Sequence, residues 1–109
     1  RTPFKVDVVR DRGVLARIVA GGMIENVYRL QIMNATEAEQ QYGIAVSGLP
    51  GLVVASEPQV SVESTQSRWV AVRLQLPYEA AAPGTHPIHF EITAHDAQLS
   101  EKSVFLVPR

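Results

Sequence analysis

The sequence predicts an all-β protein folded as an antiparallel β-sandwich. Apolar and polar residues alternate in seven or eight short segments, which is the period of strands that bury one face. Glycine, proline and asparagine, which favour turns, separate these segments at short intervals. Residues 79–82 form the only helix-like stretch, and it is too short to be stable as a helix by itself.

The clearest strand pattern in the N-terminal half lies at residues 24–34. Tyr28, Leu30 and Ile32 point to one face, and the polar residues between them point to the other. The polar segment that follows this strand forms a turn or a single helical turn. Further strands are expected at residues 4–10, 14–19 and 41–49, the second of them as a strand or an extended edge segment.

Asparagine marks both ends of the strand at residues 24–34. Asn34 suits the turn that follows the strand, because asparagine side chains bond to nearby backbone groups. Asn26 is expected to satisfy backbone groups where the strand begins. Both asparagines are therefore explained by the fold and need no ligand.

The C-terminal half contains one interrupted segment and three regular ones. Pro58 breaks residues 53–63, which is typical of an edge strand or of a strand that changes sheets. Later strands are expected at residues 69–77, 87–95 and 102–108. Because strands follow one another without alternating helices, an immunoglobulin-like arrangement is the leading prediction, and a partly closed barrel is the alternative.

Length and composition exclude several classes of protein. The 109 residues have the length of one domain, and 46% hydrophobic with 19% charged residues is typical of a globular chain. The net charge of −1 argues against a nucleic-acid surface, which needs a basic excess. The absence of cysteine excludes a disulfide, and no apolar run approaches the roughly 20 residues that span a bilayer. Because residue 1 is Arg, we expect a fragment or a processed piece of a larger protein.

Three histidines are the weak candidates for a metal site. His86 and His89 are three residues apart and fall on opposite faces of a strand. His89 and His95 share a face but lie about 20 Å apart along it. No pair closes a metal site without another strand, so solvent-facing histidines are the favoured interpretation.

The sequence offers no catalytic motif and a few candidates for an interaction surface. No serine lies in a Gly-x-Ser-x-Gly turn, and no glycine-rich loop opens a helix, so no enzyme activity is expected in this domain. Trp69 starts a strand on the face opposite its apolar residues, where tryptophan can anchor an interface. Arg10 and Arg12 lie in a basic N-terminal region that is suited to anionic lipid headgroups.

The residues DVVRDRGVLAR, followed by GMIENVYRLQIMNAT, resemble the start of the C-terminal domain of FixG/CcoG proteins. The likeness continues through QQYGIAVSGLPGL and PGTHPIHFEITA and covers nearly the whole chain. These proteins are bacterial membrane-bound accessory proteins for cbb-type cytochrome c oxidase. The resemblance implies an immunoglobulin-like domain that follows the last membrane helix.

The resemblance implies that the full-length protein binds iron–sulfur clusters and acts in copper handling, with copper(II) reduction as the proposed activity. No cofactor is expected in this domain, because no residue here matches the cluster-binding motifs. The family topology implies an inner-membrane protein with this domain in the periplasm, tethered to the membrane through the missing N-terminal part.

Three hypotheses for the domain follow. The leading one is a non-catalytic interaction domain that binds a protein partner, such as an oxidase subunit, a copper chaperone or another part of its own chain. The second is a copper relay in which His86, His89 or His95 acts with Met23 or Met33, because copper accepts imidazole and thioether ligands. The third is a structural spacer.

Overall fold

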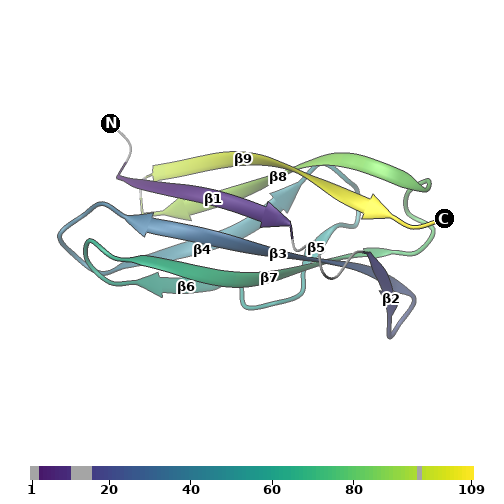
Figure 1. Ribbon diagram of the computed structural model, residues 1–109, viewed down its shortest axis with the longest axis horizontal. Coiled ribbons are helices and arrows are strands. Elements are labelled where there is room, and N and C mark those ends of the chain that lie inside the picture. The colour runs from purple at the N-terminus through teal and green to yellow at the C-terminus, as the bar shows by residue number, and fades with distance from the viewer. Residues whose placement is uncertain (1–2, 11–15, 96) are drawn as a thin grey trace.

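A computed structural model of the chain describes residues 3–10, 16–95 and 97–109. This part of the chain contains nine strands and no helix (Figure 1). The strands are β1 (Phe4–Arg10), β2 (Arg17–Val19), β3 (Met23–Asn34), β4 (Gln40–Ser47), β5 (Val53–Val54), β6 (Gln59–Val62), β7 (Ser67–Pro77), β8 (Gly84–Ala94) and β9 (Ala97–Val107).

The strands form two antiparallel sheets that pack face to face. The first sheet has the order β1-β3-β7-β5, with β2 also paired to β3, and the second has the order β6-β4-β8-β9. The sandwich is elongated, with extents of 46 × 22 × 21 Å. Strands β1 and β9 lie alongside each other at one side of the sandwich (Figure 1).

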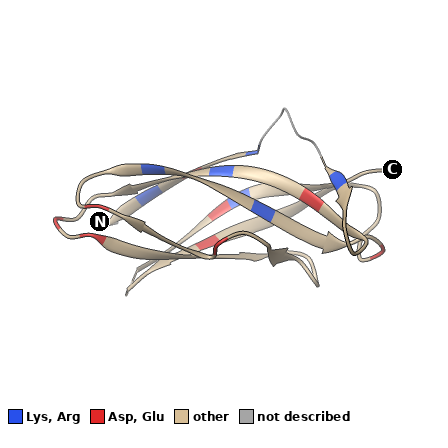
Figure 2. Ribbon diagram, turned by 90° about the horizontal axis from the view of Figure 1, so that it is seen from below, with Lys and Arg blue, Asp and Glu red and all other residues tan. Residues whose placement is uncertain are grey.

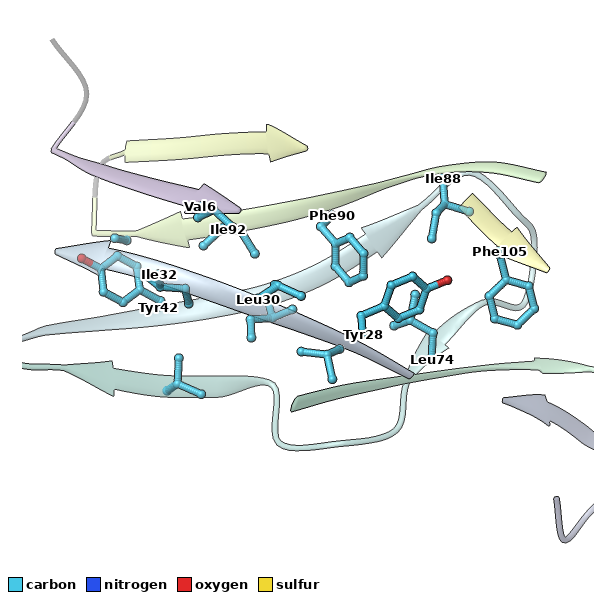
Figure 3. Packing of buried hydrophobic residues seen from close by; sticks show 14 of the residues in the cluster. Val6, Tyr28, Leu30, Ile32, Tyr42, Leu74, Ile88, Phe90, Ile92 and Phe105 are labelled. Carbon is cyan, nitrogen blue, oxygen red and sulfur yellow. The ribbon is translucent and has the colours of Figure 1, made fainter. Parts of the chain in front are cut away.

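The core fills the space between the sheets and confirms the predicted alternation. In β3 every second residue from Ile24 to Asn34 is buried, as the pattern predicts for a central strand. Figure 3 shows Tyr28 and Phe90 facing each other across the core, and their ring centroids lie 5.1 Å apart in an edge-to-face arrangement. Phe4 and Tyr42 form a second such pair at 5.0 Å.

The sandwich prediction is confirmed, with one more strand than the upper number expected. Pro58 lies between β5, which belongs to the first sheet, and β6, which belongs to the second. Of the two alternatives expected for this segment, the chain therefore shows the change of sheet. The polar segment after β3 forms no helical turn, and of residues 14–19 the structure describes only 16–19, with β2 at Arg17–Val19.

Candidate functional site

The outward side chains of the first sheet form the candidate site, which we call the β3–β7 face. They project from β1, β2, β3 and β7 in the rows that alternate with the core residues. Figure 2 marks the charged residues along these strands. The β3–β7 face comprises Lys5, Asp7, Val9, Arg17, Val19, Met23, Glu25, Val27, Arg29, Gln31, Met33, Ser67, Trp69, Ala71, Arg73, Gln75 and Pro77.

Trp69 is the largest apolar side chain exposed on this face. It is 52% exposed and lies opposite Gln31 in the pairing of β3 with β7. The guanidinium carbon of Arg29 lies 5.7 Å from the centroid of the indole ring. This cation–π contact contributes about 0.5–1 kcal/mol at an exposed site and favours this arrangement of the two side chains. The structure therefore places the predicted anchor on the outside of the sheet.

Glu25 is a buried carboxylate on the same face, at the end opposite Trp69. It is only 2% exposed because the side chains around it cover it. Arg17 Nη2 donates to Oε1 at 3.0 Å, and Arg73 Nη1 donates to Oε2 at 3.0 Å. Gln75 Nε2 donates to Oε2 at 2.9 Å. Two arginines therefore share one carboxylate, and this end of the face keeps a net positive charge.

The environment of Glu25 favours its ionised form. Desolvation raises the pKa of the carboxyl group, but the hydrogen bonds from Gln75, Arg17 and Arg73 and the positive charge of Arg73 together outweigh desolvation. The pKa of Glu25 therefore lies below its ordinary value of 4.5. Both arginines remain about half exposed, with side-chain exposures of 60% for Arg17 and 45% for Arg73.

We expect Glu25→Gln to lower the free energy of unfolding by about 1–2 kcal/mol at pH 7, because the two arginines lose their charged acceptor. The loss is no larger because both arginines are partly exposed and recover part of their hydration. The pKa of Glu25 is lowered on folding, so its contribution is complete above pH 4.5 and is lost as the pH falls through the folded pKa. Urea unfolding from pH 7 to pH 3 should show the gap between wild type and variant closing below pH 4.5. A gap that is constant down to pH 3 would contradict this.

Two polar side chains in β3 reach across the core to the backbone of β9. Asn26 Nδ2 donates to Leu106 O at 3.1 Å, and Leu106 N donates to Asn26 Oδ1 at 2.9 Å. Tyr28 Oη donates to Val104 O at 2.7 Å. Burial raises the pKa of the Tyr28 hydroxyl, which therefore stays protonated as a donor. These bonds occupy backbone groups at the edge of the second sheet, as expected where an edge strand is protected.

The three histidines lie at different places in the second sheet and its loops. His86 Nε2 is 2.7 Å from Ala82 O, in the row of β8 that faces the core. His89 is half-buried on the outer side, opposite Lys102. His95 follows β8 in a turn with φ 51° and is exposed, so it does not continue the strand as expected.

The methionines lie on the other sheet. Met23 and Met33 are the first and eleventh residues of β3 and point to the outer side of the first sheet. His89 points to the outer side of the second sheet, so the sandwich separates it from both sulfur atoms. Within residues 3–10, 16–95 and 97–109, no three His, Cys, Asp or Glu side chains are grouped to hold a metal ion.

Of the two predicted basic residues, the structure describes one. Arg10 is the last residue of β1 and pairs with Tyr28 of β3. It lies in the row that faces the core and is half-buried, so it is not part of the β3–β7 face. Arg12 lies outside the described residues. The described residues contain no helix that is long and apolar enough to cross a membrane.

The two antiparallel sheets and their connections define the protein as an immunoglobulin-like β-sandwich domain. A family model described as "IG-like fold at C-terminal of FixG, putative oxidoreductase" matches residues 1–108. The chain belongs to this family of FixG C-terminal domains, as its sequence motifs predict. The description links the domain to an oxidoreductase and assigns no activity to the domain itself.

Similar solved structures support the fold. A FixG-related protein from Vibrio parahaemolyticus is 23% identical, with a TM-score of 0.83 and 97% of each chain covered. The cupredoxin domain of amoB from Nitrosocaldus yellowstonii is 10% identical, with a TM-score of 0.57, 81% of this chain and 57% of that one covered. Native E. coli alpha-2-macroglobulin is 16% identical, with a TM-score of 0.58, and 97% of this chain matches 7% of it. A search of curated proteins gave no match.

Proposed function

We propose that this chain is a non-catalytic interaction domain of a FixG/CcoG-like membrane-bound iron–sulfur protein. In this proposal the full-length protein acts in copper handling and cbb-type cytochrome c oxidase assembly, and the domain binds a protein partner. An oxidase subunit or a copper chaperone would be such a partner. The domain would lie in the periplasm and be tethered to the inner membrane by the preceding part of the protein.

The observation that carries this proposal is the exposed Trp69 held by Arg29 on the outer side of the first sheet. A half-exposed tryptophan on the outer side of a sheet leaves apolar area in water, and tryptophan and arginine are among the residues that most often dominate binding energy at interfaces. The cation–π contact also favours one arrangement of both side chains before a partner binds, which lowers the entropy cost of association. A tryptophan that only filled the core would be neither half-exposed nor in contact with an exposed arginine.

The proposal is tested by Trp69→Glu in the full-length protein. We expect partner affinity to fall at least tenfold, because a charge replaces an interface anchor. The amount of active oxidase in the membranes should therefore fall. Copper(II) reduction by the solubilised full-length protein should not change. Tyr78→Glu is the matched control, because Tyr78 is 49% exposed but lies in the turn after β7.

Two results would contradict an interaction domain. One is that oxidase assembly is unchanged both in Trp69→Glu and when residues 1–109 are removed. This is the result expected if the domain is only a structural spacer. The other is saturable copper binding by the isolated domain that is lost on His89→Ala or His86→Ala. Calorimetric titration with Cu(I) and Cu(II) measures this directly.

A further inference from the structure

We infer that the β3–β7 face binds an extended, acidic segment of a partner protein, with Trp69 as the apolar anchor of the contact. This inference rests on the proposed interaction function and names the surface and the chemistry of its partner. Charge, geometry and the distribution of apolar residues each support it.

The first argument is the excess of positive charge on the β3–β7 face. The β3–β7 face carries four basic residues and two acidic ones, which are Lys5, Arg17, Arg29 and Arg73 against Asp7 and Glu25. The outer side of the second sheet carries Lys102 and Glu91, whose charges balance, together with His89. The chain as a whole has a net charge of −1, so the basic excess on one face is local. A surface of this kind attracts an acidic partner.

The second argument is that the acidic residues of the face do not neutralise its cations. Glu25 is bound by Arg17 and Arg73, and the two positive charges exceed its single negative charge by one. Arg29 instead contacts the ring of Trp69, and no salt bridge to a carboxylate is formed by Arg29 or Lys5 within the described chain. Arg29 therefore presents a charge next to an apolar ring, which suits a carboxylate beside an apolar side chain.

The third argument is the spacing of these groups along the strands. Side chains on one face of a strand repeat every ~6.7 Å, and an extended partner segment has the same repeat. Successive rows of the face present Trp69 beside Gln31, then Arg29, then Arg73 beside Val27. A partner segment that alternates acidic and apolar residues would therefore meet these rows in register.

A lipid surface is a poorer match for the face. On the outer side of the first sheet, the large hydrophobic residues exposed to this degree are Trp69, Val53 and Val9, at 52%, 46% and 40%, and Val53 lies apart from Trp69, opposite Gln75. Asp7 lies among the cations, next to Gln31 in the pairing with β1. Anionic headgroups would be repelled at Asp7, whereas a partner with discrete charges can leave that position neutral.

The test uses a fluorescent synthetic peptide of alternating Glu and Ser with one central Phe. A peptide with Lys in place of Glu is its control. Binding is measured by anisotropy at low and high salt, with vesicles of phosphatidylglycerol and phosphatidylcholine as the lipid probe. We expect Arg29→Gln to weaken peptide binding about threefold to tenfold and Trp69→Ala about tenfold. Asp7→Asn should strengthen it about twofold, because it removes a repulsive charge.

Lys102→Gln is the matched control, because it removes one exposed positive charge from the other sheet. Salt-sensitive binding that changes as described, with Lys102→Gln neutral, supports the inference. No binding of the acidic peptide overturns it. The inference is also overturned if Lys102→Gln weakens peptide binding as much as Arg29→Gln does. Binding to the vesicles but not to the peptide would overturn it as well, and so would dimerisation of the domain that Arg29→Gln abolishes. If oxidase assembly still needs Trp69 in any of these cases, the proposed function stands without this inference.

Discussion

Asn34→Ala should lower the free energy of unfolding by about 3 kcal/mol, because one buried and several partly buried backbone groups lose their partners together. Asn34 is buried, with 3% of its surface exposed. Its Nδ2 donates to Ala38 O at 2.9 Å, to Val62 O at 3.0 Å and to Glu63 O at 3.3 Å. Its Oδ1 accepts from Thr36 N at 2.9 Å. One side chain thus ties the loop after β3 to the end of β6.

Urea unfolding of wild type and Asn34→Ala measures this loss directly. Asn34→Asp keeps the acceptor for Thr36 but removes the donors, so it should also be strongly destabilising. Gln41→Ala is the control, because Gln41 is exposed and its side chain bonds only Ser61, and we expect a change within about 0.5 kcal/mol. A loss below 1 kcal/mol in Asn34→Ala would mean that water replaces the side chain at this turn.

The central strands were predictable because burial on one face imposes a period of two on the sequence. In β3 the core row from Ile24 to Asn34 has this period without interruption. Pro58 was equally informative, since a residue without a backbone N–H cannot continue a central ladder. Both signals are local, so they could be read without knowledge of the neighbouring strands.

The partners of the two asparagines could be predicted only in part. The sequence placed Asn34 in the turn after β3, and its bond to Thr36 is local. Asn26 was expected to satisfy backbone groups near its own strand, but it bonds the backbone of Leu106, which lies 80 residues away. The pairing of Tyr28 with Val104 spans 76 residues in the same way. Such bonds depend on how the sheets are stacked, which no local pattern encodes.

Trp69 could be singled out from its position in the alternation, whereas the polar cluster at Glu25 could not. Glu25 occupies an outward position and should be exposed according to the pattern of β3 alone. It is buried because the register places Arg17 of β2 and Gln75 of β7 directly opposite it. The short strand β2 was expected only as a strand or an edge segment, so its register and this cluster could not be derived.

Gly48→Ala should be the most damaging of the small substitutions, with a loss of about 3 kcal/mol or more. Gly48 has φ +122°, a conformation that residues with a Cβ atom rarely adopt. An added Cβ would lie 2.8 Å from Pro87 O and 2.9 Å from Ile88 Cα. Both contacts are with the backbone of β8, a strand held between β4 and β9, so no side-chain movement can relieve them.

Gly43→Ala in the same strand region is the matched control for this effect. Gly43 lies within β4, and the nearest atom to an added Cβ is Thr93 O at 3.9 Å, an ordinary contact. We expect Gly43→Ala to change stability by less than about 1 kcal/mol, in the stabilising direction, because alanine restricts the unfolded chain. Thermal and urea unfolding of both variants give the comparison. Equal losses in the two would mean that any methyl group disturbs β4, whereas a large loss only in Gly48→Ala assigns the effect to the close approach of its turn to β8.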